Sequence, residues 1–210
     1  MAGAIEWPGW CRGGRTEDEA MHALLEYGPR YERVLRTAGI DFQTPADVSA
    51  FEVVERLKGT ATTDFGVADV APSGDAAPVD DAELHRQKAL LEACWAAFDT
   101  AVQVAHGRDL RKGPRGGGRD LTGVVGHVTG AEASYLKRLG GKPPDEKYQD
   151  GPALINQQRR IILETLDASA RGEIPTQGPR GSVRWTPRYF VRRAAWHVLD
   201  HVWEIEDRIV

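Results

Sequence analysis

Residues 187–209 read PRYFVRRAAWHVLDHVWEIEDRI, and this stretch decides the fold. Its apolar residues recur at the three- and four-residue spacing of an amphipathic helix; they are Val191, Ala194, Ala195, Val198, Val202, Ile205 and Ile209. Because residues four apart share one helix face, His197 and His201 stand one above the other on the flank of this apolar stripe. The stretch therefore predicts a long helix that presents two imidazoles at the rim of a core.

Three segments before it show the same period. The first begins at Asp80 or Asp81 and ends before the Gly- and Arg-rich stretch 107–119. The second runs from a capping aspartate, Asp120, to Gly140-Gly141, and the third covers about 151–170. Four amphipathic helices with connections of moderate length predict an up-down four-helix bundle over residues 80–210.

The second of these helices carries His127 on a flank equivalent to that of the two later histidines. Neutral imidazole is a common ligand for zinc and is also accepted by nickel, copper and iron. Three protein ligands leave coordination positions open, as in sites that activate a small molecule. The pattern predicts that His127, His197 and His201 bind one divalent metal ion, although an H-x-x-x-H pair also arises by chance. The remaining histidines lie in ordinary helical settings; they are His22, His85 and His106.

The chain before the bundle has a different composition. Residues 71–79 contain prolines, alanines and few large apolar groups, which is typical of a linker. Residues 1–70 predict a small sheet packed on one helix, so the expected fold class is α+β, with a small N-terminal α/β sheet domain followed by the bundle. The expected elements are a strand over Ala4–Trp10, a helix over Glu17–Ala38 bent at Pro29, and a hairpin of Phe51–Leu57 with Phe65–Val70.

Charge and composition narrow the class of partner. The chain has 27 basic and 31 acidic residues and a formal net charge of -4, so no nucleic-acid partner is expected. No apolar run has the length of a membrane span, and the two cysteines give neither a disulfide framework nor a thiolate metal site. We expect a cytoplasmic protein that acts on a small molecule.

The two histidine-bearing helices resemble those of the DinB/YfiT-like family. The similar segments are DLTGVVGHVTGAE at 120–132 and WHVLDHVWE at 196–204, and their order and spacing agree with the family over about 80–210. The resemblance implies a four-helix bundle with a three-histidine site, usually for zinc or nickel, here at His127, His197 and His201. Some members are transferases or isomerases that use a low-molecular-weight thiol such as mycothiol or bacillithiol, and many have no known reaction.

The N-terminal segment is similar to HicB-like antitoxin domains. The similar residues are Trp7-Pro8-Gly9-Trp10-Cys11, Gly14 and Thr16-Glu17-Asp18-Glu19-Ala20. This similarity implies the local strand, turn and helix-cap pattern. An antitoxin-like role would need a basic groove or a nuclease partner, and the acidic balance argues against the groove.

Other residues of the last helix fall near the direction of its histidines. Glu204 is a candidate either to orient His201 or to act as a general base, and its alternative is a surface pair with Arg208. Arg192 or Arg193 is a candidate to hold a substrate carboxylate by a two-pronged hydrogen bond, with Arg193 the residue expected at a cofactor site; the alternative is solvated surface.

Two features suggest further contacts. Glycines beside His127, at positions 123, 126 and 130, predict either a close helix approach or room for a ligand. Trp196 and Trp203 project away from the main stripe, which predicts a second contact surface covered by the N-terminal domain or by a second subunit, as in a homodimer.

Two functions follow from these residues. One is a metal-dependent enzyme, a thiol transferase or a hydrolase, which predicts an open cavity beside the three histidines. The other is a non-catalytic, stress-associated protein that binds a metal or small ligand and has an N-terminal protein-interaction domain. It predicts a closed site and an apolar surface around Trp196 and Trp203.

Overall fold

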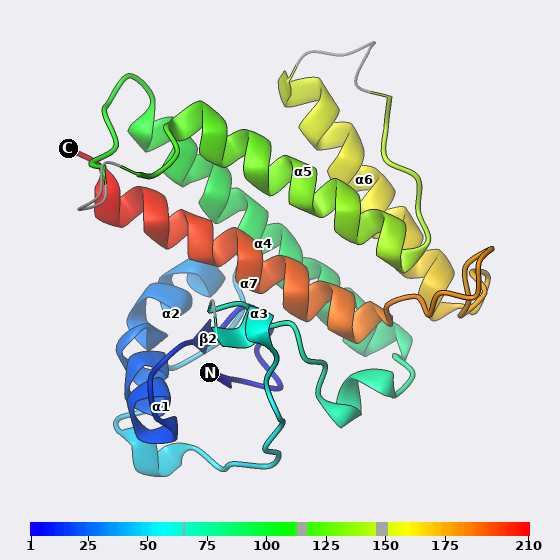
Figure 1. The fold of residues 1–210 in the computed structure, drawn as a ribbon, viewed down its shortest axis with the longest axis horizontal. Coiled ribbons are helices and arrows are strands. Elements are labelled where there is room, and N and C mark those ends of the chain that lie inside the picture. Colours follow the sequence, from blue (N-terminus) through cyan, green and yellow to red (C-terminus); the bar gives the residue numbers. More distant parts are fainter. Residues whose placement is uncertain (65, 113–116, 146–150) are drawn as a thin grey trace.

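The computed structural model describes residues 1–64, 66–112, 117–145 and 151–210. Its long helices are α4 (Asp81–Ala105), α5 (Leu121–Leu139), α6 (Gly151–Ala170) and α7 (Pro187–Arg208), which pack together as a bundle (Figure 1). α7 lies against both α4 and α5, and α6 packs mainly on α5 and α4. The helices expected from the apolar period are therefore present.

The expected helix caps explain where the long helices begin. The side chain of Asp80 accepts a hydrogen bond from Glu83 N at 2.8 Å, and Asp120 does the same for Gly123 N at 2.7 Å. α5 ends at Gly140, whose φ of 114° is the left-handed conformation that favours glycine. The two caps of α5 fix where this helix begins and ends on either side of His127.

The N-terminal segment contains the short helices α1 (Glu17–Glu26) and α2 (Gly28–Thr37). The expected single helix is divided at Tyr27, because Pro29 has no N–H to donate to the carbonyl four residues earlier. Trp10, Tyr31 and Leu35 belong to the same hydrophobic core as the bundle helices. The N-terminal segment thus packs directly on the bundle.

The expected sheet is wrong in extent and position. Strand β1 (Ala2–Gly3) pairs with β2 (Cys11–Arg12), and the predicted strand Ala4–Trp10 is the connection between them, turned at Pro8-Gly9. Within the described residues the chain is therefore mostly helical, with one very small sheet.

The predicted hairpin of Phe51–Leu57 with Phe65–Val70 is also absent from the described part of the chain; Phe65 itself lies outside it. Residues 51–60 form no regular element, and the short helix α3 (Ala61–Asp64) follows. The Thr60 hydroxyl accepts hydrogen bonds from the N–H groups of Thr62 and Thr63, so the threonine run starts a helical turn instead of a strand. The remaining short elements are the 3₁₀ turns η1 (Val48–Ala50) and η2 (Ser73–Ala76).

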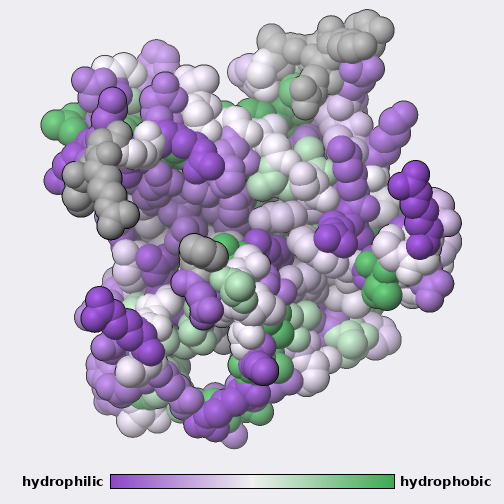
Figure 2. Space-filling model, in the orientation of Figure 1, coloured by the Kyte–Doolittle hydropathy of each residue, from purple (hydrophilic) through white to green (hydrophobic). Residues whose placement is uncertain are grey.

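Apolar side chains are turned inward. On the face shown in Figure 2, hydrophobic residues form small scattered patches among hydrophilic ones. Among the described helices none is long and apolar enough to cross a membrane.

Candidate metal centre

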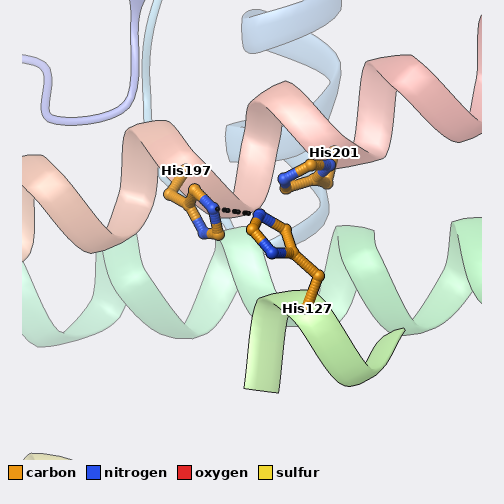
Figure 3. Close-up of side chains that lie close together, drawn as sticks. All are labelled: His127, His197 and His201. Atoms are coloured by element: carbon orange, nitrogen blue, oxygen red, sulfur yellow. Dashed lines mark hydrogen bonds between the residues drawn. The ribbon is translucent and has the colours of Figure 1, made fainter. Parts of the chain in front are cut away.

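The three predicted ligands come together between α5 and α7. His127 lies on α5, and His197 and His201 lie one turn apart on α7, with their rings turned toward one another (Figure 3). His197 and His201 are buried, with exposed fractions of 7% and 8%, and His127 is half-buried. The apolar stripes of both helices explain this position, because packing them into the core brings their flanks into contact.

The distances between ring nitrogens suit a shared ion. One ligand nitrogen from each histidine lies within 4.8 Å of the other two, and Nε2 of His197 is 3.2 Å from Nε2 of His127. In a tetrahedral zinc site, metal–nitrogen bonds of about 2.1 Å separate neighbouring nitrogens by about 3.4 Å. Small rotations of the side chains would therefore bring all three onto one ion.

A carboxylate fixes the orientation of one ring. His201 donates from Nδ1 to Oε2 of Glu204 at 2.6 Å, because a carboxylate only accepts. The lone pair of His201 is then on Nε2. Glu204 also pairs through Oε1 with Arg208, so both predicted contacts of this glutamate are present at once.

Burial keeps the other two imidazoles neutral. It lowers the pKa of His197 to about 3, with further contributions from the charges that His201 and His127 would carry. Burial also lowers the pKa of His127, and the positive charge of Arg119 acts in the same direction. At neutral pH, His197 and His127 are therefore unprotonated, and each has a nitrogen lone pair that can bind a metal ion.

Arg208 joins the site to the connection between α4 and α5. Its guanidinium donates to the carbonyls of Arg111 and Arg119 at 2.9 and 2.8 Å, besides pairing with Glu204. The described part of the Gly- and Arg-rich stretch 107–119 therefore lies beside the site; its residues 113–116 are outside the described chain.

Aromatic residues lie beside His197, at the end of the site away from His201 and Glu204. The ring of Tyr135 lies 5.7 Å from the His197 ring and 5.1 Å from that of Trp185. The guanidinium of Arg193 lies over the rings of both Tyr135 and Trp196. Sequence reasoning missed Tyr135 as a site residue, although its spacing of eight from His127 places it on a neighbouring face of α5.

The glycines beside His127 do not mark a close helix approach. A Cβ atom added at Gly126 or Gly130 would meet no atom within 4 Å. At Gly123 it would meet only the capping side chain of Asp120 and the side chain of Arg119. The structure therefore leaves open space along this strip.

The apolar surface expected around Trp196 and Trp203 is not present. Their exposed fractions are 5% and 1%. The ring of Tyr27 packs edge-on against that of Trp203, with 5.0 Å between the ring centres. The Arg12 guanidinium lies over the Trp203 ring. The N-terminal segment covers Trp203, which is one of the two coverings that the sequence predicted.

Two cavities lie between α4 and α6. One of about 240 Å³ is lined by Lys88 and Asp167 among others, and one of about 350 Å³ by Trp95 and Arg159 among others. Neither is lined by a histidine of the cluster. The open cavity expected beside the three histidines is not one of these two.

Comparison with known proteins adds no relative: no family model, no curated protein and no solved structure matches this chain. The geometry of the histidine cluster therefore carries the functional argument.

Proposed function

We propose that the protein binds one divalent metal ion, zinc or nickel, through His127, His197 and His201. The observation that carries the proposal is the convergence of three imidazole nitrogens from two helices within 4.8 Å. His127 and His197 are 70 positions apart in the chain. Helix periodicity explains why His197 lies near His201, but it does not explain why His127 lies near both.

The donor set fits such an ion. Imidazoles are borderline ligands that suit zinc and nickel, and no carboxylate belongs to the cluster, as a calcium or magnesium site would need. A histidine that binds a metal usually has a hydrogen-bond partner on its other ring nitrogen, which holds the ring in place. Glu204 is that partner for Nδ1 of His201. Glu204 acts here as a positioning residue, and its bond to Arg208 holds it in place.

The finer proposal is a metal-dependent enzyme of the DinB/YfiT-like type. It is supported by the resemblance of 120–132 and 196–204 to that family and by the three-histidine arrangement. When bound, a divalent ion with three protein ligands supplies a Lewis acid with free coordination positions for a thiol or for water. A thiol transferase would take a low-molecular-weight thiol as cofactor, and a hydrolase would not.

A second candidate is a non-catalytic protein that binds the metal for storage or sensing. Burial of His197 and His201 favours it, because a closed site retains its ion but admits substrate poorly. Binding of a thiol at the metal separates the two: in the cobalt-substituted protein, an added thiol should change the visible spectrum of an enzyme site and leave that of a closed site unchanged.

Elemental analysis of protein purified without a histidine tag tests the metal proposal. The wild-type protein should contain about one equivalent of zinc or nickel, and His197→Ala should lose it. His85→Ala is the matched control, since His85 is exposed on α4 and outside the cluster. Equal metal content in the wild-type protein and His197→Ala would overturn the proposal.

A further inference from the structure

α7 contains four arginines, and three of them have an acidic partner. Arg188 pairs with Glu83 at 3.0 Å and Arg192 with the buried Asp75 at 2.7 Å. Arg208 pairs with Glu204. Arg193 forms no hydrogen bond and no ion pair with a described residue; its charge acts only at longer range on the Asp69 carboxylate, which is itself hydrogen-bonded to Thr60 and Thr63. Among these arginines, only Arg193 is left without a direct ion pair to a described residue.

Arg193 is nevertheless held in place and partly buried. Its guanidinium lies 4.7 Å from the ring centre of Trp196 and 5.4 Å from that of Tyr135, so aromatic faces position it. Its Nη1 atom is buried and has no hydrogen-bond partner. A buried donor left unpaired is unfavourable, and an anion bound at this position would supply its acceptor.

This arginine lies beside the candidate metal centre. It precedes His197 by four residues, so both side chains share one face of α7. Tyr135 connects the two, since its ring contacts both Arg193 and His197. The Tyr135 hydroxyl also makes no hydrogen bond to a described residue, which adds a second free donor.

We infer that Arg193 and Tyr135 bind the carboxylate of a small organic acid whose other end reaches the three-histidine centre. This inference rests on the proposed function and names its substrate class. A single guanidinium matches one carboxylate, whereas a phosphate dianion would call for a second free cation, and the other arginines of α7 are already paired. The partly exposed ring of Trp185, which lies beside Tyr135, favours an acid with an aromatic or apolar body.

Benzoate and benzamide test the inference, because they have the same shape and differ in charge. Binding to the full-length, zinc-supplied protein is followed by NMR through the indole N–H signal of Trp196, assigned with Trp196→Phe. Benzoate should bind at least 10-fold more tightly than benzamide. Arg193→Gln should abolish this preference, and Arg188→Gln, which removes the same charge from the same helix, should retain it.

Arg188→Gln is a suitable control because Glu83 keeps Arg86 and Gln87 as partners. Equal binding of benzoate by Arg193→Gln and the wild-type protein would overturn the inference, as would equal binding of benzamide and benzoate. Benzoate binding that persists in Arg193→Gln but disappears in His197→Ala would assign the carboxylate to the ion, and would also overturn it.

The metal content of each variant separates this inference from the proposed function. Zinc retained in Arg193→Gln together with unchanged benzoate binding would reject the anion site alone. Absence of zinc from the wild-type protein, together with an Arg193-dependent preference for benzoate, would reject the metal and support the anion site.

Discussion

Nδ1 of His201 and Oε2 of Glu204 are 2.6 Å apart, on residues three apart in α7. The bond determines which nitrogen of His201 carries the proton, and so leaves Nε2 for the cluster. Glu204 is itself held by Arg208, which also binds the carbonyls of Arg111 and Arg119. The orientation of one proposed ligand thus depends on the connection that follows α4.

Glu204→Gln should weaken metal binding by about 10- to 100-fold without removing the stoichiometric ion, because all three imidazoles remain while one loses its anionic partner. Competition with a chromophoric chelator measures the affinity. Glu206→Gln is the control, since Glu206 pairs with Arg30 and Arg33 of the N-terminal segment. Identical affinities for the wild-type protein and Glu204→Gln would show that this carboxylate does not support the site.

Glu132 should make stability fall as pH rises. It is buried, accepts a hydrogen bond from Trp95 Nε1, and burial raises its pKa from 4.5 to about 7, despite the nearby positive charge of Arg159. Between pH 4.5 and about 7 the folded state holds more protons than the unfolded one, so the free energy of unfolding decreases with pH. The shift corresponds to roughly 3 kcal/mol.

Urea unfolding of the wild-type protein and Glu132→Gln at pH 4.5 and pH 8 measures this effect. His197, whose pKa is lowered to about 3, acts in the opposite direction in both proteins, so the difference between them isolates Glu132. The variant should gain roughly 3 kcal/mol over the wild-type protein between the two pH values. A constant difference would mean that folding does not raise the pKa of Glu132.

Gly130→Ala should stabilise the protein by about 1 kcal/mol, because alanine favours a helix and its Cβ would enter open space. Gly28→Ala is the contrasting variant, since its Cβ would lie 2.3 Å from Cγ2 of Thr44 and should destabilise the fold. Thermal unfolding compares the two. A loss of stability in Gly130→Ala would indicate that the strip beside His127 is packed after all.

Trp203→Ala should cost about 3–5 kcal/mol, the range for removal of a large buried aromatic side chain. The cost arises because the Trp203 side chain is 1% exposed and contacts both the bundle core and Tyr27 of the N-terminal segment. Val183→Ala, at a side chain 73% exposed, should change stability little. A cost below about 1 kcal/mol for Trp203→Ala would show that the N-terminal segment contributes little there.

Local patterns predicted the helical part of this protein well. Asp80, Asp120 and Gly140 act at the ends of α4 and α5 through hydrogen bonds and backbone conformations set within a few residues. The hairpin over Phe51–Leu57 and Phe65–Val70 failed because strand propensity depends on a neighbouring strand, and Val53, Val54 and Leu57 remain exposed on the structure. The division into residues 1–70 and 80–210 stays a prediction.

The sequence by itself determined that His197 and His201 share a helix face, since that relation follows from the geometry of one helix. Only the tertiary structure decided that His127 meets them and that Arg193 forms no ion pair with a described residue, whereas Arg188, Arg192 and Arg208 do. Distances across a bundle depend on how the helices pack, and the pairing of a charge depends on which side chains of other elements reach it. Both facts arise between segments far apart in the chain.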